Sequence, residues 1–381
     1  MELNELLKTA MQHGASDIHL KVGSTPVLRI SGELIPLASE PRLTQVDAIK
    51  IASGVMSPSK YETFKKKNDA DVAYSIPGLG RFRCNLYVQR GTIGLVIRII
   101  PSKTPTLEDT NLPDVLKKIS MEERGLVLVT GATGSGKSTT LAAMVDYINM
   151  NKTRNIVTIE DPIEYLHRDK KSIVSQREVG NDTESFGGAL RSALRQDPDV
   201  ILVGEMRDYE TIQTALTASE TGHLVLSTLH TVDATETVSR IISFFPPYQH
   251  NQVRFQLASV LKGIISMRLM PRADGKGRVP AAEILVATST AKDCILDSDK
   301  TKLLLNVIAQ GKIHYGMQTF DQSIFDLYKE GMITYEEALR AASNPDDFIL
   351  KVKGISSTSE MTYNGSTETK PKGIEIERFQ K

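Results

Sequence analysis

The sequence is poor in cysteine and has no long apolar run, and each shortage excludes a class of protein. Its 381 residues include two cysteines, Cys84 and Cys294, which lie far apart in apolar segments. Two cysteines are too few for a four-cysteine zinc site, and a cytoplasm would keep them reduced. No apolar run approaches the roughly 18 residues of a membrane span, and residues 1–5 are acidic, unlike a signal peptide. We expect a cytoplasmic protein with no direct membrane span.

The chain also has no excess of charge of either sign. Lysine plus arginine and aspartate plus glutamate both number 46, so the formal net charge is zero. Nothing in this balance favours attraction to nucleic acid, and we expect no nucleic-acid partner. The hydrophobic content of 40% and charged content of 24% are typical of a globular protein. The chain has more residues than usually share one hydrophobic core, which predicts two or three domains.

The first hundred residues have the pattern of an α+β domain with an antiparallel sheet. A helix is predicted from about Glu2 to His13. Residues 81–89 alternate between polar and apolar side chains, as in a half-buried strand, and residues 90–92 can turn this strand into a second one at 93–100. Prolines in the segment 101–112 indicate a linker.

Residues 113–286 alternate between short apolar runs and helical patterns. The runs 156–160, 200–205 and 224–228 are separated by helical periodicity, which predicts a parallel sheet with crossover helices. Residues 287–354 then have helical patterns. The stretch 355–381 is rich in serine, threonine, lysine and glutamate, which predicts a flexible tail. The fold class is therefore α/β.

The most specific motif is a complete phosphate-binding loop, G-x-x-x-x-G-K-[ST], at residues 131–138. An apolar strand precedes it, and Leu141, Met144, Val145 and Ile148 follow at the spacing of one helix face. A serine- and glycine-rich turn is the alternative, but it explains neither flank. In such a loop the lysine pairs with the β- and γ-phosphates and the serine hydroxyl holds Mg²⁺. The expected ATP-binding residues here are Gly131, Thr133, Gly134, Ser135, Gly136, Lys137, Ser138 and Thr139.

Two groups of carboxylates follow predicted strands of the same sheet. Glu164 is placed to polarise the attacking water, with Glu160 and Asp161 supporting Mg²⁺ or its waters. Asp161 and the following proline also have the pattern of a helix start. Glu205 ends an apolar run and is expected to bind the metal through water. Because one acid cannot serve both as metal contact and as base, Glu164 is the favoured base and Glu205 the alternative.

Histidines and arginines complete the candidate site. His223 and His230 bracket one strand, so they lie at its opposite ends and cannot chelate one metal. A histidine at the carboxyl end could sense the γ-phosphate, although a purely structural role is the alternative. Arg83, Arg90 and Arg98 are candidates for stabilising γ-phosphate charge if their domain closes over the nucleotide; solvated strand arginines are the alternative.

Four segments resemble, in order, the sequence boxes of the type II/IV secretion and pilus ATPase superfamily. They are the Walker A box at 131–139, the Asp box at 159–164, the Walker B box at 197–208 and the His box at 221–235. The chain is most similar to its PilT-type retraction family, from residue 3 to about residue 354. The resemblance implies a hexameric ring ATPase with a PAS-like domain joined to a RecA-like domain. It also implies Glu164 as catalytic glutamate, Glu205 as Walker B acid, His223 and His230 as box histidines, and γ-phosphate contacts from arginines of the 81–98 segment.

Two features of the sequence distinguish branches of this superfamily. Relatives that assemble pili usually carry an extra amino-terminal domain and a four-cysteine zinc module. The sequence has too few cysteines for the module, and we expect no extra domain. Segments 317–322 and 342–345 also resemble the retraction branch, whereas 290–295 departs from its Ala-Ile-Arg-Asn-Leu-Ile motif. The resemblance thus implies ATP and Mg²⁺, a pilus platform protein as partner, and a location at the cytoplasmic face of the inner membrane. A pilus-assembly or type II secretion ATPase and a DNA-translocating ring remain alternatives.

Overall fold

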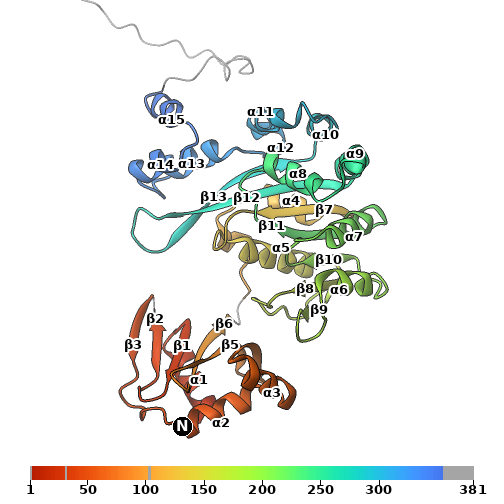
Figure 1. The fold of residues 1–381 in the computed structure, drawn as a ribbon. Helices are drawn as coiled ribbons and strands as arrows, with labels where there is room; N and C mark the ends of the chain where they lie inside the picture. The colour runs from red at the N-terminus through yellow and green to blue at the C-terminus, as the bar shows by residue number, and fades with distance from the viewer. Residues whose placement is uncertain (1, 31, 102–103, 355–381) are drawn as a thin grey trace, which may run out of the picture.

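The structure is a computed structural model, which describes residues 2–30, 32–101 and 104–354. The chain forms two sheet-containing parts that follow one another along the sequence (Figure 1). We call them the N-terminal part, up to residue 100, and the phosphate-loop part, from residue 104. Each has its own hydrophobic core. The predicted tail, residues 355–381, lies outside the described residues.

The N-terminal part contains an antiparallel sheet, as predicted. Its strand order over the described residues is β3-β2-β1-β6-β5-β4. The predicted hairpin is confirmed as β5–β6, which turns at Arg90 and Gly91 with φ of 48° and 76°, the left-handed values of a type I′ turn. The strands are β1 (Asp17–Lys21), β2 (Val27–Ile30), β3 (Glu33–Pro36), β4 (Asp69–Ile76), β5 (Gly80–Gln89) and β6 (Thr92–Ile100).

Three helices pack with this sheet among the described residues. The predicted first helix is confirmed as α1 (Leu3–Gln12). The helices α2 (Gln45–Val55) and α3 (Pro58–Lys67) were not predicted, although both have a start signal. Thr44 and Asp47 form a capping box, and Ser57 caps a helix whose first residue is proline. The helices cover fully buried sheet residues such as Phe82, Leu86 and Leu95.

The phosphate-loop part is built on a largely parallel sheet, which confirms the prediction. Its order over the described residues is β13-β12-β7-β11-β10-β8-β9, and β13 at the edge is antiparallel. The central strands β7 and β11 are buried along their whole length, because helices cover both faces. The strands are β7 (Gly125–Thr130), β8 (Asn155–Glu160), β9 (Ile173–Glu178), β10 (Val200–Val203), β11 (Leu224–Leu229), β12 (Leu261–Pro271) and β13 (Arg278–Val286).

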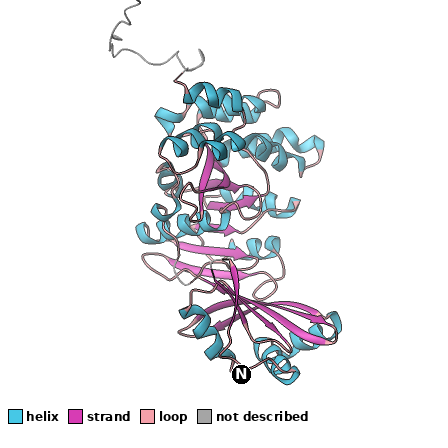
Figure 2. Cartoon of the chain, turned by 90° about the vertical axis from the view of Figure 1, so that its left-hand side faces the viewer, coloured by secondary structure: helices cyan, strands magenta, loops and turns pink. Residues whose placement is uncertain are grey.

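Helices lie on both faces of this sheet (Figure 2), and further helices lie beyond its β12–β13 edge (Figure 1). One face packs against α4 and α5, and the other against α6 to α9. The predicted helical segment after residue 286 is confirmed as α10 to α15. The helices are α4 (Val115–Ser120), α5 (Lys137–Asn151), α6 (Phe186–Ala193), α7 (Tyr209–Glu220), α8 (Ala234–Ser243), α9 (His250–Val260), α10 (Ser289–Leu296), α11 (Leu304–Gln310), α12 (Lys312–Tyr315), α13 (Phe320–Lys329), α14 (Tyr335–Ala341) and α15 (Pro345–Val352). Across residues 2–30, 32–101 and 104–354, no helix has both the length and the apolarity that crossing a bilayer requires.

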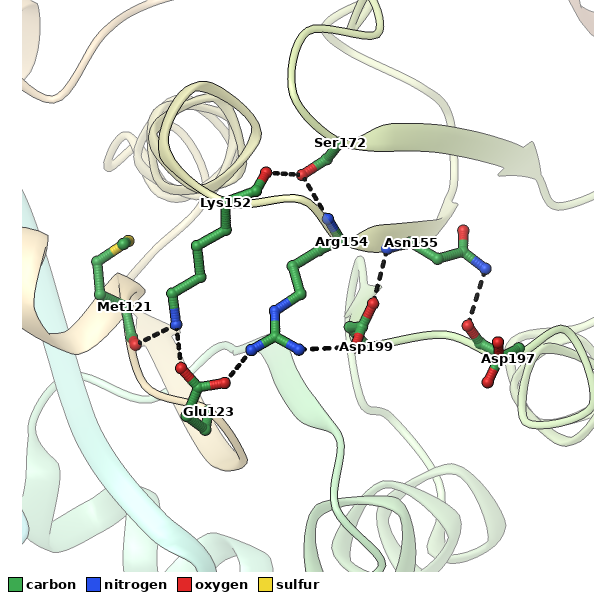
Figure 3. Close-up of polar contacts among 8 residues, drawn as sticks. All are labelled: Met121, Glu123, Lys152, Arg154, Asn155, Ser172, Asp197 and Asp199. Atoms are coloured by element: carbon green, nitrogen blue, oxygen red, sulfur yellow. Dashed lines mark hydrogen bonds and ion pairs between the residues drawn. The ribbon is translucent and has the colours of Figure 1, made fainter.

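An ion-pair network ties together the loops that enter three of the parallel strands (Figure 3). Arg154, before β8, pairs with Glu123, before β7, and with Asp199, before β10, at 2.8 Å. Lys152 joins through Glu123, and the Asp199 carboxylate also accepts the backbone N–H of Asn155 at 2.8 Å. This network fixes the amino ends of the strands whose carboxyl ends carry the candidate site.

Charged groups also join the two parts of the chain. Glu178, at the end of β9, is 3% exposed and pairs with Arg81 of β5. Its carboxylate also accepts hydrogen bonds from the Ile163 backbone, at 3.1 Å, and from the Asn181 amide. Asn181 in turn accepts a hydrogen bond from Lys60 of α3. Glu178 therefore connects the N-terminal part to the loop that contains Glu164.

We expect Glu178→Ala to destabilise the protein, because it leaves the largely buried Arg81 guanidinium and the Ile163 N–H without their acceptor. Removing one partner of a buried pair costs about 3–5 kcal/mol, and we expect a loss near 3 kcal/mol in urea unfolding. Asp71→Ala is the matched control, because the pair of Asp71 with Arg83 is about half exposed and should contribute under about 1 kcal/mol. Equal effects of the two substitutions would contradict the assignment.

Candidate functional site

The phosphate loop lies between the end of β7 and the start of α5. Lys137 is the first residue of α5, so the loop N–H groups and the helix N-terminus face the same space. Gly134 and Gly136 have φ of 77° and 101°, which side chains rarely allow. A Cβ at Gly131 would lie 2.5 Å from the Met267 carbonyl oxygen. Glycine is therefore required where the loop curves against β12.

The groups of this loop are arranged to receive an anion. The Lys137 ammonium is buried and donates to the carbonyl oxygens of Gly131 at 2.8 Å and Ala132 at 3.0 Å. Burial lowers the pKa of Lys137, and the nearby carboxylates of Glu205 and Glu164 offset part of this effect. The Ser135 hydroxyl is buried with no hydrogen-bond partner. A buried hydroxyl without a partner and a lysine that bonds only carbonyls fit a bound phosphate.

A hollow of about 380 Å³ opens beside the loop. It is lined by Gly131–Ser135, Val232 and residues of the β12–β13 hairpin, including Arg268 and Arg278. The Arg268 guanidinium lies 3.9 Å from the centre of the Phe320 ring, which holds it in place. Sequence reasoning missed both arginines, because an isolated arginine on a strand has no motif. They add positive charge to a space already suited to phosphates.

Glu205 and His230 come together at the carboxyl edge of the sheet. The Glu205 side chain is 13% exposed and pairs with Arg207 at 2.7 Å. Nε2 of His230 lies 3.4 Å from the same carboxylate, which is a long contact. Glu205 lies two residues after β10, and His230 directly follows β11, the neighbouring parallel strand. The structure thus places Glu205, His230 and Lys137 around one edge.

The loop after β8 differs from the sequence-based expectation in two respects. The helix start predicted at Asp161 is wrong: the chain continues as a loop, and the Ile163 N–H bonds Glu178 rather than a helix cap. Glu160 is partly buried and accepts hydrogen bonds from Thr158 at 2.6 Å and Gln176 at 3.0 Å. Burial raises the pKa of its carboxyl group. The Glu160 carboxylate is therefore already bonded by neighbouring side chains, which disfavours the role near Mg²⁺ that we expected for it.

Glu164, in contrast, is exposed on this loop. The next residue, Tyr165, contacts Thr139 of α5 through its hydroxyl at 2.9 Å. That contact holds the loop beside the helix that starts at Lys137. Glu164 is therefore a carboxylate that is open to solvent, adjacent to the phosphate loop and attached on both sides to fixed structure.

His223 lies away from these groups. It precedes β11, whose first residue pairs with Gly125, so it lies at the amino edge of the sheet. Its Nδ1 contacts the Ala218 carbonyl oxygen at 2.9 Å. A strand of this length separates it from His230 by about 20 Å. The opposite placement of the two histidines was expected, but ATP binding by His223 stays a prediction that this single chain does not support.

Two of the three predicted N-terminal arginines are paired within their own sheet. Arg83 contacts Asp71 at 3.3 Å, and Arg98 contacts Asp17 at 3.0 Å. Arg90 occupies the left-handed turn of the β5–β6 hairpin. Only Arg83 of the three lines the cavity of about 90 Å³ between the two parts of the chain, together with Arg81 and Asp161. Their contact with a γ-phosphate stays a prediction.

The arrangement has the chemistry of phosphoryl transfer from a phosphoanhydride to water. A lysine, loop N–H groups and two arginines provide positive charge, while Glu164 and Glu205 provide carboxylates at the same edge. No group of three metal-ligating side chains occurs among the residues that the structure describes. Mg²⁺ in a nucleotide site does not need such a group of side chains, because water and phosphate oxygens supply most of its ligands.

Known proteins with this arrangement are similar over almost the whole chain. The chain is 44% identical over 348 residues to the type IV pilus retractation ATPase PilT of Pseudomonas aeruginosa, covering 91% of this chain and all of that protein. It is 43% identical to the type IV pilus ATPase PilU of the same organism, covering 93% and 92%. The type II secretion system protein E of Aeromonas hydrophila is 35% identical, but only 53% of its length is covered.

Solved structures agree with these relationships. A crystal structure of the pilus retraction motor PilT with bound ADP matches with a TM-score of 0.84 and 46% identity, covering 91% of this chain and 98% of that one. The Legionella pneumophila ATPase DotB matches with a TM-score of 0.73 and 28% identity, covering 92% and 95%. The family model described as type II/IV secretion system protein matches residues 1–306. The chain therefore belongs to the type II/IV secretion system protein family, as an ATPase of its PilT-like group.

Proposed function

We propose that this chain is a Mg²⁺-dependent motor ATPase that drives the retraction of type IV pili. The main support for this proposal is the buried Lys137 ammonium, which lies in the phosphate loop and donates to the carbonyl oxygens of Gly131 and Ala132. It occurs in a chain whose similarity to PilT extends over the full length of that protein. The identity to the type II secretion system protein E of Aeromonas hydrophila is 35%, below the 44% identity to PilT, which favours retraction over secretion.

The chain's residues have distinct roles in this proposal. The loop N–H groups and Lys137 bind the phosphates of ATP, and Arg268 and Arg278 add charge beside them. Glu164 orients the attacking water and accepts its proton, because it is open to solvent at the same edge. His230, in contact with Glu205, responds to the presence of the γ-phosphate.

The residues present also fit the expected metal. Ser138 follows Lys137 in the first turn of α5, and Glu205 lies at the end of β10 with a largely buried carboxylate. Ser138 would ligate Mg²⁺ directly and Glu205 through water. The ion, when bound, would neutralise charge that develops on the phosphate oxygens.

Motor function in this proposal requires a ring of subunits. The arginines Arg83 and Arg98 are paired with carboxylates of their own sheet, so they reach a nucleotide only if domains move or a neighbouring chain presents them. We propose a homo-hexamer at the cytoplasmic face of the inner membrane. Rotation of the N-terminal parts would move a docked pilus platform protein.

Two substitutions separate nucleotide binding from hydrolysis. Lys137→Ala should reduce ATPase turnover by about 100-fold or more, because its charge is needed where phosphate charge develops. Glu164→Gln should retain ATP binding and lose hydrolysis, because an amide cannot accept the proton. Lys118→Ala, at an exposed position of α4, is the control and should change neither quantity. Normal steady-state turnover by Glu164→Gln would assign the base elsewhere, with Glu205 as the leading candidate.

The biological assignment is tested by deleting the gene. A strain that lacks this protein should carry surface pili, more than its parent, yet fail to spread by twitching. Complementation with Glu164→Gln should not restore spreading, whereas the Lys118→Ala chain should. Complete loss of surface pili in the deletion strain would instead indicate an assembly role, and normal twitching would contradict a retraction motor.

A further inference from the structure

Glu283 is a buried carboxylate that the mechanism above does not use. It lies on β13 and is 3% exposed. Its partner across the strand pair is Ser266 of β12, and Ser266 is itself opposite Thr130 of β7. The Thr130 hydroxyl donates to the Ser266 hydroxyl at 2.9 Å. Because Thr130 directly precedes the phosphate loop, a row of polar side chains crosses the sheet from that loop to Glu283.

The Glu283 carboxylate also holds the start of α8. Its Oε1 accepts a hydrogen bond from the backbone N–H of Ala234, the first residue of that helix, at 2.9 Å. The first N–H groups of a helix have no partner within it, and the helix dipole favours a negative charge there. The segment that enters α8 includes His230, beside Glu205, and Val232, which lines the hollow at the phosphate loop.

Glu283 is also influenced by Arg268, which lines the same hollow. Arg268 lies on β12 two residues after Ser266, and its charge acts on the Glu283 carboxylate. Arg268 and Val232 both line the hollow, from different elements. Glu283 therefore bonds the start of the helix that follows Val232 and interacts electrostatically with Arg268.

We propose that Glu283 is a positioning residue for ATP hydrolysis, which holds Val232 and His230 at the phosphate loop through the start of α8. This inference rests on the proposed ATPase function. The charged groups that face Glu283 are Asp233 of the α8 cap, Arg268 of β12 and Asp321 of α13. Burial raises the pKa of Glu283 to about 7, and the two aspartates act in the same direction, against the Ala234 N–H and Arg268.

The raised pKa of Glu283 makes the folding stability of the protein depend on pH. Between the ordinary value of 4.5 and the folded value of about 7, the folded protein binds more protons than the unfolded chain. The stability of the protein with respect to this group therefore falls as pH rises through that interval. A glutamine at position 283 would not lose folding stability in this way as pH rises. Folding stability therefore does not account for the presence of a carboxylate at this position.

The test is Glu283→Gln, which keeps the size and the acceptor oxygen and removes the charge. At about pH 8 we expect a melting temperature above that of the wild type, with the difference absent near pH 5. We expect kcat to be about tenfold lower at the higher pH, with the Kd for ADP within about twofold. An amide oxygen attracts the Ala234 N–H and Arg268 more weakly than a carboxylate does, so the walls of the hollow are held less firmly while the loop is intact. We expect wild-type kcat to rise between about pH 6 and pH 8 as Glu283 loses its proton, and we expect this rise to be smaller in the variant.

Two further variants separate positioning from structure. Glu283→Asp keeps the charge but shortens the side chain, so it should lower kcat without raising the melting temperature. Glu336→Gln makes the same charge change at an exposed position of α14 and should alter neither quantity. A Glu283→Gln protein with wild-type kcat and pH profile, or one that loses stability and activity together, would overturn the proposal. An inactive wild-type protein would contradict the ATPase function itself, so the two failures are distinguishable.

Discussion

Parallel pairing of β7, β11, β10 and β8 is the constraint on which the candidate site depends. Register places their carboxyl ends at one edge of the sheet, so the segments that follow them meet there. The phosphate loop follows β7, and the carboxylates and His230 follow the other three strands. At the opposite edge, Arg154 and its partners tie the loops that enter three of these strands. A shift in register would separate the catalytic groups from one another.

The phosphate loop, Glu164, Glu205 and His230 could be predicted as candidates from the sequence, because each comes within a few residues of the end of a recognisable apolar strand. The groups that were missed come from elsewhere. Arg268, Arg278 and Glu283 lie on a hairpin far along the chain and reach the site only because β12 pairs with β7. Single charged residues on a strand have no motif that distinguishes them from a solvated face. The helix expected after Asp161 failed for a related reason, since a tertiary contact with Glu178 replaced the local cap.

Ion pairs of the N-terminal part connect it to the phosphate-loop part and are the contacts that a motor cycle would have to change. Glu178 joins Arg81 to the backbone of the loop that carries Glu164. In the N-terminal sheet, Arg83 and Arg98 already have carboxylate partners. Movement of that sheet toward a nucleotide would exchange these partners for phosphate oxygens. Nucleotide state and domain orientation would thus be coupled through a small set of ion pairs.

The most direct test of this account is the distance between the two parts of the chain in different nucleotide states. Spin labels at Ser39→Cys and Gln213→Cys are exposed, whereas the native cysteines Cys84 and Cys294 are buried. Labelled chains diluted into unlabelled protein report distances within one subunit. We expect the distance distribution of the Glu164→Gln protein to shift between the nucleotide-free and the ATP–Mg²⁺ states. Identical distributions in both states would contradict coupling of ATP binding to domain movement.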